Sequence, residues 1–168
     1  MHSLCRLRLH RLAAKCNLAR MSAPAPPVPE TTDDAFFGGA LRLVQPRLGH
    51  RMGTDAVLLA AACPAGAGDV CDLGAGAGAV GLRLAQIAPG RRVALVEKDA
   101  AVSALAAANA AANSLVDRVT IVEADILAKG FAGQGSALAG RFDAVLSNPP
   151  FGEAGRMRAS PVARRAAA

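Results

Sequence analysis

Short apolar runs alternate with longer helical segments from residue 69 onward. Four runs have the length and apolar character of buried strands: residues 69–73, 92–96, 119–123 and 142–146. Helices are predicted over residues 79–88, ending before Pro89-Gly90, and over residues 99–113, where Asp99 is a suitable N-cap. The connection between the last two strands is glycine-rich and poorly patterned. Strands separated by helices predict a parallel sheet with crossover connections.

Upstream of this region the pattern is shorter and less regular. A Gly38-Gly39 turn precedes the alternating segment at residues 40–45, which is predicted to be a strand. A helix is predicted to follow, with Thr54 as its N-cap and Asp55 in its first turn, and to end near Pro64. The folded part therefore begins near residue 31.

The two ends of the chain are expected to lie outside the folded domain. Residues 1–30 combine a basic, acid-free start with a Pro-rich stretch, and residues 156–168 form an Arg/Ala-rich tail; both are predicted to be disordered. An organellar transit peptide is one interpretation of the start, but translation from Met21 or a simple tail is favoured. One domain over residues 31–155 remains.

The net charge of +6 belongs to the ends of the chain. Residues 1–20 contribute +5 and residues 151–168 contribute +3, whereas the stretch between them carries −2. Charge alone therefore does not indicate a polynucleotide partner. The longest apolar run, residues 56–63, is too short to span a bilayer, so no membrane partner is expected.

The cysteines and histidines show no metal-ligand spacing, because no Cys-x-x-Cys pair occurs and the three His are scattered. No metal is expected. Cys63 and Cys71 lie in apolar surroundings and are predicted to be small core residues of a reduced, cytoplasmic protein.

A glycine loop, Gly74-Ala75-Gly76-Ala77-Gly78, follows the first of the four strands and opens a helix. Glycine allows a sharp backbone turn and a close ligand approach, and the helix N-terminus offers unpaired N–H groups. Glu97 ends the next strand, 23 residues after Gly74, where a carboxylate can accept from both hydroxyls of a ribose. This spacing predicts an adenosine-type ligand.

Two kinds of ligand fit this loop. Gly76, Gly78 and Gly81 match the dinucleotide pattern G-x-G-x-x-G, although glycine-rich chains produce it by chance. Asp72 precedes the first glycine, and its carboxylate is unfavourable beside a pyrophosphate. An amino-acid tail carrying a sulfonium is a better neighbour. Asp72 is also explained by a role in capping the turn.

Asn148-Pro149-Pro150-Phe151 follows the fourth strand. Because ligands of open parallel sheets bind beyond the carboxyl ends of the strands, this segment is predicted to lie beside the glycine loop. The Asn148 side-chain oxygen and the Pro149 carbonyl can accept both hydrogens of a planar NH₂ group, and Phe151 can stack on the ring that bears it. A plain Asn-Pro turn is the simpler alternative.

Together these motifs resemble class I S-adenosylmethionine-dependent methyltransferases that act on exocyclic or amide nitrogens. The run from Phe36 through Gln45-Pro46 to Leu59, and the stretch from Asn109 to Asp125, are further similar to the bacterial tRNA1(Val) (adenine-37-N6)-methyltransferase family. The resemblance covers about residues 33–160. It implies S-adenosyl-L-methionine as cofactor and tRNA as partner.

The resemblance also assigns roles to individual residues. The glycines of the loop are expected beside the methionine part of the cofactor, Glu97 on the ribose and Asp125 on the adenine amino group, with Thr54 and Asp55 closing over the methionine end. The implied cofactor-binding set is Thr54, Asp55, Asp72, Gly74, Ala75, Gly76, Gly78, Glu97, Lys98, Asp125, Ile126 and Asn148. The implied catalytic set is Asn148, Pro149, Pro150 and Phe151.

The expected fold class is α/β, a Rossmann-like doubly wound parallel sheet of a class I methyltransferase. About four of the family's seven strands are expected, in the order 3-2-1-4 and with the fourth strand at an edge. We hypothesise that the sequence is truncated and that the complete enzyme is a monomer. A glutamine-amide methyltransferase acting on a protein, or an inactive nucleotide-binding fragment, are the alternatives.

Overall fold

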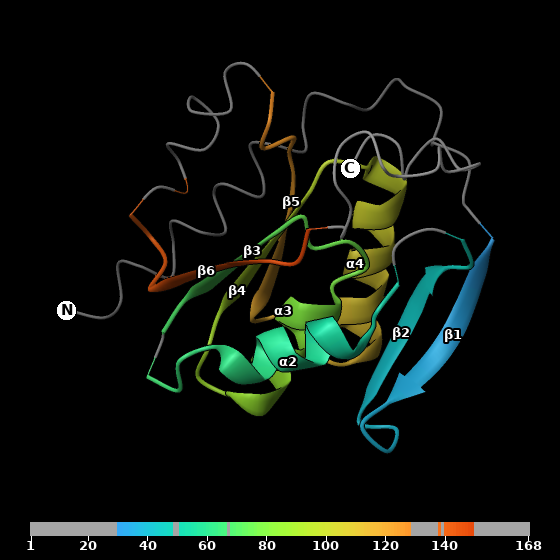
Figure 1. Cartoon of the computed structure of the whole chain (residues 1–168), viewed down its shortest axis with the longest axis horizontal. Helices are drawn as coiled ribbons and strands as arrows, with labels where there is room; N and C mark the ends of the chain where they lie inside the picture. The colour runs from blue at the N-terminus through green and yellow to red at the C-terminus, as the bar shows by residue number, and fades with distance from the viewer. Residues whose placement is uncertain (1–29, 49–50, 67, 129–137, 139, 150–168) are drawn as a thin grey trace.

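The structure is a computed structural model that describes residues 30–48, 51–66, 68–128, 138 and 140–149. Its central feature is a parallel sheet whose strands follow the order β5-β4-β3-β6 (Figure 1). The strands are β3 (Val70–Leu73), β4 (Val93–Glu97), β5 (Val119–Glu123) and β6 (Ala144–Ser147). In chain order this is third, second, first and fourth strand, so the predicted topology is confirmed.

In the described ranges, α2 (Thr54–Ala62) precedes the sheet, α3 (Ala79–Ile87) connects β3 to β4, and α4 (Ala100–Ala112) connects β4 to β5. Asp99 caps α4 as predicted, because its carboxylate accepts from the amides of Ala101 and Val102. The N-cap of α2 is Gly53, however, which makes no side-chain capping bond. The prediction of Thr54 as N-cap was wrong, because the backbone enters the helix one residue earlier and Val57 N already bonds to Gly53 O.

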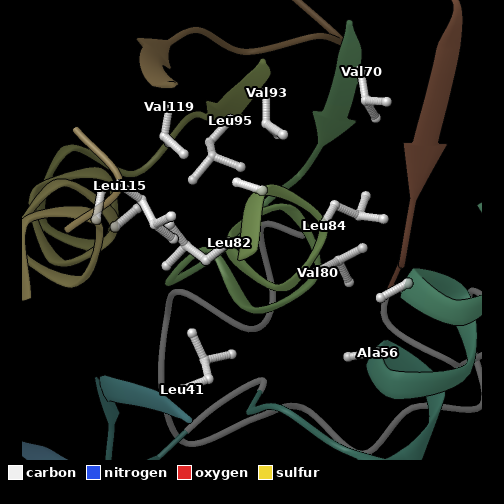
Figure 2. Packing of buried hydrophobic residues seen from close by; sticks show 14 of the residues in the cluster. Leu41, Ala56, Val70, Val80, Leu82, Leu84, Val93, Leu95, Leu115 and Val119 are labelled. Carbon is white, nitrogen blue, oxygen red and sulfur yellow. The ribbon is translucent and has the colours of Figure 1, made fainter. Parts of the chain in front are cut away.

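Alanine-rich helices and branched strand residues form the main core on one face of the sheet. Leu82 and Leu84 of α3 are fully buried against Val93 and Leu95 of β4 (Figure 2). Small residues of α2 and α4, such as Ala60 and Ala106, complete the cluster. Because alanine has little side chain to bury, the helices must approach the sheet closely to exclude water.

Gly81 shows how close this approach is. A Cβ at Gly81 would overlap the Leu95 side chain and lie 3.0 Å from Val93 Cγ1. The third glycine of the G-x-G-x-x-G pattern therefore serves the packing of α3 on β4. It does not lie on the open side of the loop.

The opposite face of the sheet carries a smaller cluster, centred on Cys71, Ala94 and Val96. Phe142 packs against it, while Val145 of β6 is 58% exposed. Strand β6 begins two residues later than predicted, because its pairing with β3 starts at the Val70–Ala144 partners.

An antiparallel hairpin of β1 (Thr31–Phe36) and β2 (Leu41–Pro46) lies beside α4 (Figure 1). Strand β2 was predicted, but β1 was not, because its sequence TTDDAF is rich in Asp, which is uncommon in strands. Pairing over all six residues with β2 supplies the hydrogen bonds that make it a strand. Phe37 and the two glycines of the turn have positive φ, and Gly39 N donates to Phe36 O at 3.1 Å.

Cys63 and Cys71 are buried and unpaired, in agreement with their predicted place in the core. Burial, together with the neighbouring Asp72, raises the pKa of the Cys71 thiol to about 11. Among the described residues no cluster of His, Cys, Asp or Glu could hold a metal ion. No helix in the described ranges has the length and apolar content needed to cross a membrane. Of the predicted tails, residues 1–30 and 156–168, all but Glu30 lie outside the described residues. The Glu30 carbonyl accepts from Arg47 N at 2.7 Å.

Candidate functional site

The carboxyl ends of the four parallel strands share one edge of the sheet, and the predicted site residues follow them. The glycine loop comes after β3, and β6 pairs directly with β3 in parallel. At the end of this pair, the Ser147 hydroxyl donates to the Leu73 carbonyl at 3.0 Å. The structure thus brings the glycine loop and Asn148 to neighbouring positions, as the sequence predicts.

The glycine loop depends on backbone conformations that other residues avoid. Gly74, Gly76 and Gly78 have φ values of 70°, 58° and 94°. The amides of Gly74 and Ala75 both donate to the Val96 carbonyl, at 2.9 and 3.0 Å. A Cβ at Gly74 or Gly76 would meet no atom within 4 Å. The loop therefore leaves open space on its outer side while its backbone is tied to β4.

Asp72 lies under this loop and is 1% exposed. Its Oδ2 accepts from the amide of Gly81 at 3.0 Å, in the first turn of α3. Burial raises the pKa of Asp72 to about 7, the Gly81 hydrogen bond opposes this rise, and the nearby Glu97 adds to it. This geometry supports the capping role considered for Asp72, and a contact with a ligand stays a prediction.

Glu97 ends β4 and joins two segments at the site edge. Its Oε2 accepts from Gly76 N at 3.0 Å, and its Oε1 accepts from Asp99 N at 2.9 Å. A carboxylate has about four acceptor positions, so both oxygens retain capacity for a ligand hydroxyl. The hydrogen bonds from the Gly76 and Asp99 amides fix the orientation of the Glu97 carboxylate, and with it the positions of the remaining acceptor sites.

Three further predicted cofactor residues differ in exposure. Lys98 and Asp125 are exposed, and Ile126 is half-buried against the smaller cluster on the far face of the sheet. Asp125 Oδ1 accepts from Leu127 N at 2.9 Å, which closes a local turn after β5. These residues follow β4 and β5 at the same edge, and their ligand contacts stay predictions.

Asn148 lies at the end of β6 and is half-buried. Its Nδ2 donates to Oδ2 of Asp55, in the first turn of α2, at 2.5 Å. Thr54, which precedes Asp55, and Pro149, which follows Asn148, are both exposed. The structure therefore joins Asp55 to the predicted acceptor segment, a contact that no local pattern in the sequence predicts. Pro150 and Phe151 lie outside the described residues.

Asn109 is a site-supporting residue for which no role was predicted. It lies in α4, is 1% exposed, and its Oδ1 accepts from Val44 N at 2.8 Å. Its Nδ2 donates to the carbonyls of Val44 and Ala77, both at 2.9 Å. One amide thus fastens the hairpin and the glycine loop to α4. An isolated Asn within an alanine-rich helix was the available signal.

The profile of the methyltransferase small domain family matches residues 51–165. This match covers more than half of the chain, and the chain belongs to that family. The fold agrees with it, since the order and direction of the four strands are those of class I methyltransferases.

Several relatives have named activities. A tRNA1(Val) (adenine(37)-N6)-methyltransferase of Porphyromonas gingivalis is 43% identical over 108 residues, which are 60% of this chain and 41% of the relative. A release factor glutamine methyltransferase of Chlorobaculum tepidum is 34% identical over 154 residues, which are 86% of this chain and 51% of the relative. The chain thus spans about half or less of these relatives.

A solved structure with the same fold contains ligands. The 16S rRNA N2 G1207 methyltransferase of T. thermophilus, in complex with AdoMet and guanosine, superimposes with a TM-score of 0.55. It is 26% identical, and the match covers 79% of this chain and 36% of that one.

Proposed function

We propose that the protein is an S-adenosylmethionine-dependent N-methyltransferase whose acceptor is the exocyclic N6 of an adenine in tRNA. The observation that carries the proposal is the pairing of β3 with β6, which sets the glycine loop beside Asn148. Methyl transfer requires the methyl donor and the acceptor amine to be bound next to each other, and the glycine loop and Asn148 are the segments proposed to bind them.

The residues at this edge fit the cofactor. Gly74 and Gly76 have open space where a side chain would otherwise project, so a ligand can approach the backbone there. Glu97 is held by two amides and retains acceptor positions for ribose hydroxyls. When bound, S-adenosylmethionine supplies a methyl group activated by a sulfonium.

Asn148 and Pro149 act on the acceptor. The Nδ2 of Asn148 is engaged with Asp55, so the Oδ1 is the atom that can accept from an amino group. The Pro149 carbonyl accepts the second hydrogen. Two accepted hydrogen bonds draw the nitrogen lone pair out of the ring and orient it toward the methyl carbon. A nitrogen–carbon bond then forms as the carbon–sulfur bond breaks, and the amino proton leaves to water.

The substrate class rests on the named relatives. The adenine-N6 enzymes resemble the chain over its central part, and adenine N6 is a planar, conjugated amine of the kind that two carbonyl acceptors suit. An anticodon-loop base is already unpaired, so it can enter a pocket at low cost. The glutamine methyltransferase relative supports a second candidate, because a glutamine side-chain amide is also a planar NH₂ group.

The test combines binding and transfer. We expect the chain to bind S-adenosylhomocysteine in calorimetry, with no comparable binding of NAD, and to transfer tritiated methyl to unmodified tRNA. Asn148→Ala should lower transfer by about a hundredfold, comparable to removing one preorganised hydrogen-bonding group from an active site, with little change in binding. Val145→Ala, at an exposed position of the same strand, is the control and should transfer at nearly the normal rate.

Three results would contradict the proposal. Equal transfer by Asn148→Ala and the unaltered chain would remove Asn148 from the mechanism. Binding of NAD without S-adenosylhomocysteine would indicate a dinucleotide-binding fragment. Transfer to a release factor but not to tRNA would select the glutamine amide as acceptor.

A further inference from the structure

The contact between Asp55 and Asn148 joins residues 93 positions apart in the chain. Asp55 lies in the first turn of α2 and Asn148 at the end of β6, and both are half-buried. In the described part of the chain no backbone hydrogen bond joins α2 to β6, so this side-chain bond is a specific link between them.

The chemistry of the two groups determines which way the Asn148 amide faces. An ionised carboxylate accepts hydrogen bonds and donates none, whereas an amide has a donor end and an acceptor end. If the amide turned over, its Oδ1 would lie against a carboxylate oxygen, which is repulsive at this distance. Asp55 therefore selects one of the two amide orientations, and in that orientation Oδ1 points away from α2.

We infer that Asp55 is a positioning residue, which orients the Asn148 amide so that its carbonyl oxygen is presented to the acceptor nitrogen. This inference rests on the proposed function, and it gives Asp55 a role different from the contact with the methionine end that the family resemblance implies. Asp55 need not touch either substrate.

The local structure holds Asp55 in place. An acidic residue in the first turn of a helix is favoured by the unpaired amides there. The side chain also folds back over Gly53, where a Cβ would overlap Asp55 Oδ1. Glycine at the N-cap thus leaves the space that the Asp55 carboxylate occupies.

The segment before α2 is anchored to the hairpin. The Met52 amide donates to Oε1 of Gln45 at 2.8 Å, and Gln45 is 2% exposed. Gln45 Nε2 and Arg51 Nη2 both donate to Asp34 Oδ2, each at 2.8 Å. The hairpin therefore fixes the entry to α2, and with it the position of the Asp55 carboxylate.

Exchanging the Asp and Asn side chains between positions 55 and 148 tests the inference. Asp55→Ala should lower kcat at least tenfold with little change in S-adenosylhomocysteine affinity. Asn148→Asp sets two carboxylates together and should lower kcat further. The double variant Asp55→Asn/Asn148→Asp restores a donor–acceptor pair in reversed order and leaves a carboxylate oxygen for the amine, so kcat should recover at least tenfold over Asn148→Asp alone. Asp117→Ala, an exposed carboxylate at the opposite edge of the sheet, is the control.

Nuclear magnetic resonance provides a readout that needs no activity. The chain has four Asn residues, so selective ¹⁵N labelling gives few side-chain amide signals. In the unaltered chain one Nδ2 proton of Asn148 should be shifted strongly downfield, and Asp55→Ala should abolish the shift while the Asn109 signals stay in place.

The outcomes separate the two proposals. An Asn148 signal that is unchanged by Asp55→Ala, or a double variant no better than Asn148→Asp, overturns the positioning role. If the unaltered chain transfers methyl to neither tRNA nor a release factor, the proposed function fails, and the Asn148 signal alone then decides whether Asp55 orients the amide.

Discussion

The glycine loop and the Asn148-Pro149 segment share one edge of the sheet but are held in different ways. The loop is held by main-chain hydrogen bonds to Val96 and by side-chain bonds to Glu97 and Asn109. The Asp72 carboxylate accepts from the helix that the loop opens. Asn148 is held by its strand and by Asp55. The donor half of the site is thus tied to the core by several side chains, whereas among the described residues the Asn148 side chain is oriented by its bond to Asp55, at the end of the β3–β6 pairing.

This difference separates two kinds of mutational effect. A change that disturbs the loop should reduce stability and cofactor affinity together, because the same buried bonds serve both. A change at Asp55 or Asn148 should reduce transfer with little loss of stability, because both side chains are half-buried. The predictions below test this separation, from the largest expected change in unfolding free energy, per substitution or per pH unit, to the smallest.

Asn109→Ala should lower the unfolding free energy by about 3 kcal/mol, because it removes three hydrogen bonds of a buried amide and leaves half-buried backbone groups of Val44 and Ala77 without that partner. It should also weaken S-adenosylhomocysteine binding. Urea unfolding and calorimetry measure the two effects. Asn113→Ala is the matched control, since Asn113 also bonds the hairpin, through Arg42, but does not reach the loop. Equal losses of affinity in both variants would refute the link to the loop.

The pH dependence of stability tests the environment of Asp72. Its pKa is about 7 in the fold and about 4 in an unfolded chain, so between these values the folded state holds a proton that the unfolded state lacks. Stability should therefore fall as pH rises through this window, by up to about 1.4 kcal/mol per pH unit, and level off above it. Asp72→Asn should flatten the profile measured by urea unfolding. A slope unchanged by Asp72→Asn would contradict this account.

Gly53→Ala should have the smallest effect on stability, about 0.5 kcal/mol, because the added Cβ displaces only the flexible Asp55 carboxylate. Transfer should nevertheless fall severalfold, since Asp55 moves off Asn148. Gly68→Ala is the control, because its Cβ would displace the Asp143 carboxylate at the other end of the sheet. Thermal unfolding and initial transfer rates compare the two. Equal transfer rates for Gly53→Ala and Gly68→Ala would contradict the proposed effect of Asp55 on transfer.

Elements with a local signal were predicted well. The strand at residues 119–123, the helix capped by Asp99 and the glycine loop all appear where the sequence places them. Each depends on interactions within a few residues: an apolar run, a capping carboxylate, or a φ value that favours glycine. The order of the four strands was confirmed as well, although it came from the family resemblance.

Features that depend on a distant partner were not predicted. Strand β1 exists because β2 pairs with it, and its Asp-rich sequence gives no strand signal. The helix entry at Gly53 reflects the space that Asp55 needs, and Gly81 serves the contact of α3 with Leu95.

The sequence by itself determined which residues could bind a donor and which could accept an amine, because residue type and spacing fix the available chemistry. Only the tertiary structure decided how those residues are held. It buried Asp72 under the loop and raised its pKa, and it brought Asp55 across 93 residues to the Asn148 amide. Burial and side-chain direction depend on atoms supplied by remote segments, and a linear pattern contains no information about their distance.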